Sequence, residues 1–116
     1  MVAQTYQEAS RRLMAQGLEE LARGDTRQAS EKGWGAAAQM LKSVAEQRGW
    51  EHKRHVALGR VVGRLAEETG DVEIRRLYRV ASDMHTNFYE DLDEPAHVAA
   101  GLADVELFLD KLARLA

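Results

Sequence analysis

The stretch GDTRQASEKGWGAAAQMLKSVAEQRG, residues 24–49, contains the two ends and the inner face of one long helix. Gly24 is a helix-stop residue, and Asp25 is a favoured N-cap with Gln28 three positions later, as in a capping box. Small and apolar residues then recur at steps of three or four, which predicts a helix over 26–48. The predicted inward residues are Ala29, Gly33, Ala36, Met40 and Val44. Small residues cluster beside Trp34, which predicts that another helix approaches closely there: Gly33, Gly35, Ala36, Ala37 and Ala38.

The segments on both sides of this stretch have the same helical spacing. A preceding helix is predicted from residues that share one face, namely Val2, Tyr6, Ala9, Leu13, Gly17 and Leu21. Downstream, Gly70 and Asp71 repeat the stop and cap signal, and they separate a helix over 54–69 from one over 72–90. The predicted core side of the helix over 54–69 consists of Val61, Val62, Leu65 and Ala66.

The last helix is predicted to begin at Pro95, because proline is favoured at the first helical position and residues 91–94 favour a turn. This helix has a narrow apolar seam that either packs on a second copy or closes the bundle: Val98, Leu102, Val105, Leu109 and Leu112. Five predicted helices with short connections and no linker indicate the fold class. We expect an all-α, antiparallel (up-and-down) bundle of four to five helices, in a single domain over residues 1–116.

The composition excludes several classes of protein and of site. The 116 residues include no Cys, which excludes disulfides, thiolate catalysis and zinc sites with Cys ligands. With 45% hydrophobic and 30% charged residues and one Pro, the chain is typical of a soluble helical domain. No apolar run approaches the roughly 20 residues that span a bilayer, and the start of the chain does not resemble a secretion signal. We therefore expect a cytoplasmic protein with no membrane contact and no cofactor.

Charge is distributed unevenly along the chain. Residues 48–79 have a net charge of +3 and residues 80–116 one of −6, whereas the whole chain has −3. The basic residues gather at the start of the third predicted helix, where they face either phosphate groups or plain solvent: Arg48, His52, Lys53, Arg54, His55, Arg60 and Arg64. His52 and His55 have the spacing of a metal-binding pair, but no Cys or HExxH motif completes a site, and we predict no metal.

The helix predicted over 72–90 has the residues best suited to chemistry. Its expected buried stripe consists of Ile74, Leu77, Ala81, Met84 and Phe88. A second stripe, at steps of four, three and four, consists entirely of hydrogen-bonding residues: Tyr78, Ser82, His85 and Tyr89. A third face has Arg76, Arg79, Asp83 and Asn87. These groups either line a binding site or are satisfied polar groups of the core beside a solvated ion pair.

Three runs of sequence resemble a known family: QASEKGWGAAAQMLKSVAEQRG (28–49), RH (54–55) and ASDMHTNFYE (81–90). They are similar to the paREP group of prokaryotic proteins, in or close to the HEPN (higher eukaryotes and prokaryotes nucleotide-binding) superfamily. The similarity extends from about Tyr6 to Leu112. The resemblance implies a HEPN-like helical bundle that acts as a homodimer or beside a small nucleotidyltransferase partner.

Many members of that superfamily are metal-independent ribonucleases with an Arg, four to six residues, and then a His, a pattern that Arg79 and His85 match. The resemblance implies that His85 acts as a general acid or base at a ribose 2′-hydroxyl and that Arg79 stabilises phosphate charge. Val80 departs from the pattern, because active members have a polar residue there. Within one helix the two side chains point about 120° apart, so they would meet only between two copies.

Two functions follow from these observations. The first is a homodimer that binds RNA or a nucleotide in a cleft, as a degenerate or active metal-independent ribonuclease with Arg79 and His85 as catalytic residues. Its expected ligand-binding residues are Tyr78, Ser82, Asn87, Tyr89, His55 and Arg54. The second is a non-catalytic interaction module that partners another protein, as in a toxin–antitoxin-like or nucleotidyltransferase pair.

Overall fold

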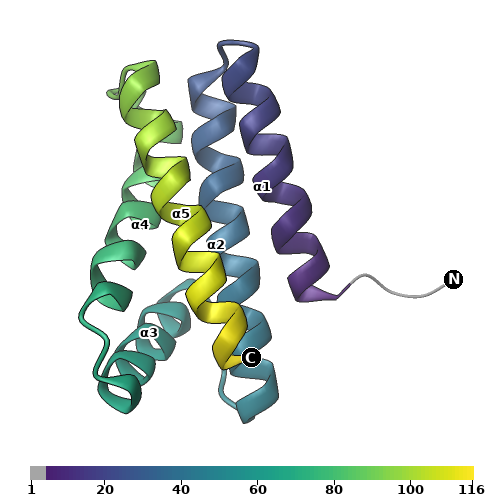
Figure 1. Cartoon of the computed structure of the whole chain (residues 1–116), viewed down its shortest axis with the longest axis vertical. Coiled ribbons are helices and arrows are strands. Elements are labelled where there is room, and N and C mark those ends of the chain that lie inside the picture. Colours follow the sequence, from purple (N-terminus) through teal and green to yellow (C-terminus); the bar gives the residue numbers. More distant parts are fainter. Residues whose placement is uncertain (1–4) are drawn as a thin grey trace, which may run out of the picture.

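The computed structural model describes residues 5–116, and this part of the chain forms five α-helices and no strand (Figure 1). Val2, which we expected on the inner face of the first helix, lies outside the described residues. The helices are α1 (Tyr6–Ala22), α2 (Thr26–Arg48), α3 (His55–Thr69), α4 (Glu73–Glu90) and α5 (Pro95–Leu115).

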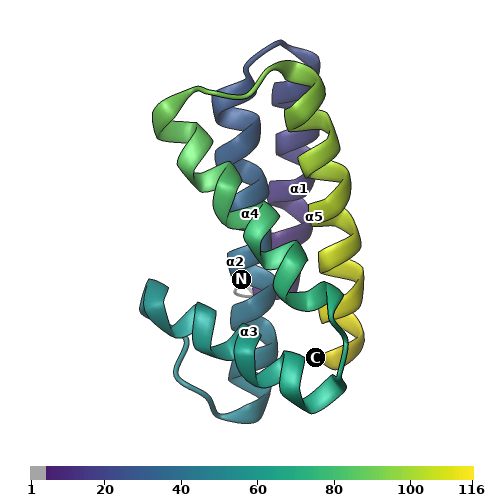
Figure 2. The same cartoon turned by 90° about the vertical axis from the view of Figure 1, so that its left-hand side faces the viewer.

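Helices α1, α2, α4 and α5 form the bundle, and α3 lies across one end of it. In Figure 1, α1 and α4 run in one direction and α2 and α5 in the opposite one. The shortest helix, α3, contacts α2 and α4 at the lower end of the molecule (Figure 2). The predicted up-and-down helical bundle is therefore confirmed. No helix within residues 5–116 has both the length and the apolar character needed to cross a bilayer.

Helix α2 is the centre of the bundle, because every other helix contacts it. The inward residues predicted for it are all buried: Ala29, Gly33, Ala36, Met40 and Val44. The approach is tightest at Gly33, where a Cβ atom would lie 2.9 Å from Leu102 Cδ2 and 3.1 Å from Met84 Sδ. A Cβ atom on Gly17 of α1 would lie 3.3 Å from Lys32 Cβ. The prediction that small residues admit a closely packed neighbour is confirmed.

The apolar seam of α5 packs into the interior. All five of its predicted residues are buried, together with Phe108: Val98, Leu102, Val105, Leu109 and Leu112. Since these side chains are already covered by the rest of the chain, the seam closes the bundle. The alternative, in which the seam stays free to pack on a second copy, is wrong.

The inner faces of α1 and α3 differ slightly from the prediction. On α1 the fully buried residues are Ser10, Met14 and Gly17, and most of the predicted stripe is half-buried. Ser10 is accommodated because its hydroxyl donates to the Ala36 carbonyl at 2.7 Å. On α3, Ala66 is half-buried, and the buried face consists of Ala57, Leu58, Val61, Val62 and Leu65.

The start of α3 is held by a carboxylate. Glu51 Oε1 accepts hydrogen bonds from the backbone N–H groups of Lys53 at 3.1 Å and Arg54 at 3.3 Å, so the helix begins one residue later than predicted, at His55. Desolvation raises the pKa of Glu51, but these N–H groups and the Arg54 guanidinium outweigh it and lower the pKa overall. The ionised carboxylate thereby fixes the turn that presents His55.

The corner between α3 and α4 is held against α5 in a similar way. Asp71 Oδ1 accepts from the backbone N–H of Glu73 at 2.9 Å, and α4 begins at Glu73 rather than at Val72. Asp71 Oδ2 accepts from Lys111 Nζ of α5 at 2.8 Å. The hydrogen bond from Lys111 and then the one from Glu73 lower the pKa of Asp71.

The last turn of α4 is closed by Asn87, which is buried where the predicted stripe placed Phe88. Its amide nitrogen donates to Ser30 Oγ of α2 at 2.9 Å. Its carbonyl oxygen accepts from the backbone N–H groups of Leu92 and Asp93, each at 2.8 Å. The buried position of Asn87 follows from these three partners, because a polar side chain without them would be costly there.

We expect alanine to be tolerated at Gly59 and not at Gly33. A Cβ atom on Gly59 would approach only Tyr78 Oη, at 3.8 Å, so Gly59→Ala should gain about 0.5–1 kcal/mol from helix propensity. Gly33→Ala must displace Leu102 and Met84, which offsets that gain. Chemical denaturation should give Gly59→Ala a free energy of unfolding at least about 1 kcal/mol above that of Gly33→Ala. Equal values would contradict the close approach at Gly33.

Asn87→Leu should lower the free energy of unfolding by about 2–3 kcal/mol, because two backbone N–H groups and the Ser30 hydroxyl lose their partner. Thr86→Leu, one position earlier and exposed, is the control and should change it by less than about 0.5 kcal/mol. Denaturant titrations followed by circular dichroism measure both. A loss that is the same for the two variants would exclude the specific role of Asn87.

Asp71→Asn should lower the melting temperature at neutral pH. Because the pKa of the folded state is lowered, the ionised carboxylate stabilises the protein above the ordinary pKa of about 3.9. That contribution is lost as the pH falls through the lower pKa of the folded state. Thermal unfolding across a pH series should therefore show the gap between wild type and variant closing as the pH falls below the ordinary carboxyl pKa. A gap that is constant with pH would refute this assignment.

Candidate functional site

Four aromatic rings from three helices meet at one place on the protein. Trp34 belongs to α2, His55 to the first turn of α3, and His85 and Tyr89 to α4. The ring centroids of Trp34 and His55 are 4.8 Å apart, those of Trp34 and His85 5.3 Å, and those of His55 and His85 5.6 Å. Because these distances are nearly equal, the rings form a triangle in which none lies between the other two. We call these four residues the aromatic surface.

The aromatic surface runs from the core to solvent. Trp34 is only 7% exposed and belongs to the hydrophobic core. The His85 side chain is 31% exposed, and Tyr89, whose ring meets His85 edge-on at 5.4 Å, is 66% exposed. His55 is exposed as well. The first turn of α3 and the last turns of α4 lie on the same side of the molecule in Figure 2. The indole therefore supports the two imidazoles, and His85 in turn contacts the exposed phenol of Tyr89.

A carboxylate orients the central imidazole. Glu31 Oε1 lies 3.2 Å from His85 Nδ1, and both side chains are about one-third exposed. A carboxylate accepts hydrogen bonds, so this contact places the proton of the neutral ring on Nδ1 and leaves Nε2 as an acceptor. The arrangement suits a general base. It also resembles the way in which many catalytic histidines are held, by a third group on the far ring nitrogen.

The predicted partner of His85 lies elsewhere on the same chain. Arg79 lines a hollow of about 240 Å³ together with Tyr78, Ser82 and Gly59. Tyr78 connects the two places, because its ring centroid is 6.1 Å from that of Trp34. Within residues 5–116 the structure therefore separates the predicted Arg79 and His85 pair, as expected from their spacing on one helix, and brings His55 to His85 instead.

The remaining predicted residues have different surroundings. Arg54 directly precedes His55, and its guanidinium lies 3.6 Å from Glu51 Oε2. Asn87 is buried, and its amide is used by Ser30 and by the turn after α4. His52 has other partners, because its Nδ1 donates to the Trp50 carbonyl at 2.8 Å and its ring meets that of Tyr6 edge-on, with centroids 5.8 Å apart. Among residues 5–116, no group of three or more His, Cys, Asp or Glu side chains is arranged to hold a metal ion.

Sequence reasoning gave Trp34 and Glu31 no role in the site. The usable signal was local: the two residues are three apart on α2, so they share one face of that helix. What the spacing could not show is that α4 packs against this face with His85 opposite both. Their roles depend on the register between α2 and α4.

The comparisons with known proteins agree with this fold. A crystal structure of a protein from Sulfolobus solfataricus matches with a TM-score of 0.82 and 18% sequence identity, covering 99% of this chain and 98% of that one. At this identity the likeness concerns the fold alone. No curated protein matches the chain. The model of the archaeal PaREP1/PaREP8 family matches residues 5–109, which is most of the chain. The chain therefore belongs to the archaeal PaREP1/PaREP8 family.

Proposed function

We propose that this protein binds RNA at the aromatic surface and cleaves the bound strand without a metal ion. The observation that carries the proposal is the triangle of Trp34, His55 and His85, in which Glu31 orients His85 and Tyr89 extends the surface into solvent. Two imidazoles that pack against a buried indole, with an exposed phenol beside one of them, are suited both to holding bases and to moving protons.

Binding would rely on stacking. Proteins recognise single-stranded RNA by placing unpaired bases on aromatic side chains, and every base offers a flat face for this. Tyr89 and His55 are the exposed rings of the aromatic surface, and both contact His85 between them. We therefore expect single-stranded RNA to bind with little sequence preference.

Cleavage would use the two imidazoles as a base and an acid. Nε2 of His85 accepts the proton of the ribose 2′-hydroxyl, and the 2′-oxygen attacks the adjacent phosphorus. The bond from phosphorus to the 5′-oxygen breaks, and protonated His55 donates its proton to that leaving oxygen. The products are a 2′,3′-cyclic phosphate and a 5′-hydroxyl. The two ring centroids lie 5.6 Å apart, so both imidazoles are near enough to act on one phosphodiester bound over their exposed edges.

The proposal also includes the assembly: a HEPN-like homodimer in the cytoplasm. Arg79 has a role only in such a dimer. Within residues 5–116 it has no ionic partner, and in its own chain it lines a hollow to which His85 does not belong. In a symmetric dimer the Arg79 side chain of one copy would stabilise phosphate charge beside His85 of the other.

Replacing Tyr89 tests the binding surface. Tyr89→Ala should weaken binding of a short single-stranded RNA by about 1–3 kcal/mol, since it removes a stacking platform. Tyr89→Phe keeps the ring and should bind within about twofold of wild type. Fluorescence anisotropy at fixed salt measures both. Equal affinities for all three proteins would exclude this surface, and an absence of RNA binding by wild type would favour the interaction module instead.

Replacing the imidazoles tests the chemistry. His85→Ala and His55→Ala should each slow RNA cleavage by about 10²–10⁴-fold while RNA affinity falls only a few-fold. His97→Ala, an exposed histidine on α5, should cleave like wild type. The cleavage rate should follow a bell-shaped pH profile and should be unchanged by a chelator. Wild-type protein that is inert on several RNAs, or a His85→Ala variant that cleaves normally, would end the catalytic part of the proposal.

A further inference from the structure

A second hollow, of about 170 Å³, opens at the start of α3 and is strongly basic. Three arginines and one carboxylate line it beside Trp50: Arg54, Arg60, Arg64 and Glu51. These four charged side chains are exposed. Arg54 is also the residue directly before His55, so the hollow adjoins the aromatic surface through one peptide bond.

The positive charge of this hollow is not neutralised from within the described part of the chain. Arg54 shares Glu51 at 3.6 Å, whereas Arg60 has no ionic partner among residues 5–116. The Arg64 guanidinium lies over the Trp50 ring, with its Cζ 4.0 Å from the ring centroid. Arg60 and Arg64 are four residues apart on α3, a spacing at which like charges repel. An anion placed between them would relieve that repulsion.

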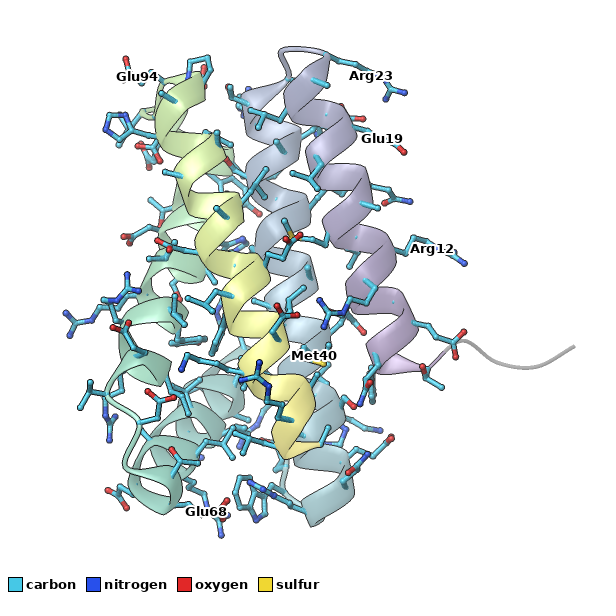
Figure 3. All side chains as sticks on the ribbon, viewed as in Figure 1. Arg12, Glu19, Arg23, Met40, Glu68 and Glu94 are labelled. Atoms are coloured by element: carbon cyan, nitrogen blue, oxygen red, sulfur yellow. The ribbon has the colours of Figure 1, made fainter. Side chains whose placement is uncertain are left out.

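Trp50, which lines the hollow, is held in place by neighbouring side chains. The Arg48 guanidinium also lies against Trp50, at 5.3 Å from the ring centroid. Arg48 in turn contacts Glu68 Oε2 at 2.9 Å and donates to the Leu115 carbonyl at 3.3 Å. Trp50 is therefore anchored to α2, α3 and the end of α5, at the end of the molecule where Figure 3 labels Glu68. Guanidinium groups aligned on such a platform lose little freedom when they bind a ligand.

We propose that this hollow binds a phosphate group through Arg60 and Arg64, with Arg54 at its rim. A guanidinium presents planar, forked donors that match two phosphate oxygens, and these charge-assisted contacts are among the strongest hydrogen bonds in proteins. The phosphate has two sources. It is the backbone of a strand whose bases lie on the aromatic surface, in which case the inference rests on the proposed function, or it is the phosphate chain of a free nucleotide.

Inorganic tripolyphosphate tests the hollow without RNA. It should raise the melting temperature of wild-type protein above that in sodium chloride of equal ionic strength. In a Trp34→Phe variant, which leaves Trp50 as the sole tryptophan, it should also shift Trp50 emission as Arg64 moves to the anion. Arg60→Gln and Arg64→Gln should each weaken binding about tenfold. Arg23→Gln, at the opposite end of the molecule in Figure 3, should not.

Two results would overturn the inference: no effect of tripolyphosphate on wild-type melting, or an equal loss of binding in Arg23→Gln. An RNA titration over a salt series identifies the source. If the strand supplies the phosphate, the slope of log affinity against log salt should fall by about one in Arg60→Gln. If the slope is the same in Arg60→Gln and wild type although wild type binds tripolyphosphate, the hollow binds the phosphate chain of a free nucleotide. A third result separates this inference from the proposed function. If Tyr89→Ala loses RNA binding while Arg60→Gln and Arg64→Gln bind both RNA and tripolyphosphate like wild type, the phosphate site in the hollow is refuted and the proposed function stands.

Discussion

The contact between Gly33 of α2 and Met84 of α4 is the constraint on which the rest of the structure depends. A Cβ atom at Gly33 would lie 3.1 Å from the sulfur of Met84 and 2.9 Å from Leu102 Cδ2 of α5, so a larger residue would force these side chains to shift. The next residue on each helix is aromatic. Once Gly33 and Met84 are pressed together, Trp34 and His85 lie side by side, with their ring centroids 5.3 Å apart. Core packing and the candidate site are thus two faces of a single helix contact.

Polar contacts between the same two helices fix how far one is shifted along the other. Asn87 donates to Ser30, and Glu31 holds His85, so two polar pairs fix the register on the side of Gly33 and Met84 where α2 begins and α4 ends. Sliding one helix by a turn would break all of these interactions together. A site built across a close-packed interface is therefore rigid, which favours catalytic groups that must keep their geometry.

Helix α3 adds what the four-helix bundle lacks. It lies across one end of the bundle (Figure 2). Its first residue, His55, belongs to the aromatic surface, and Arg54, the residue before it, lines the basic hollow. Its position depends on charged contacts at its two ends: Glu51 holds the turn before it, and Asp71 is bound by Lys111 of α5. Because these contacts are polar and partly exposed, they weaken as salt rises and as acid protonates Glu51 and Asp71.

Local chemistry in the chain was enough to place the helices and their inner faces. Gly24, Asp25 and Pro95 act within one turn of their own position, and the seam of α5 follows from spacing alone, so no distant residue was needed. The residue types of the site, above all His85, were visible in the same way. The partners of His85 were not, because Trp34 and Glu31 lie more than fifty positions away and meet it only through the register of two helices. That register depends on how the two helix surfaces fit together at Gly33. The fit is a property of packed surfaces in three dimensions, and the periodicity of the sequence does not encode it.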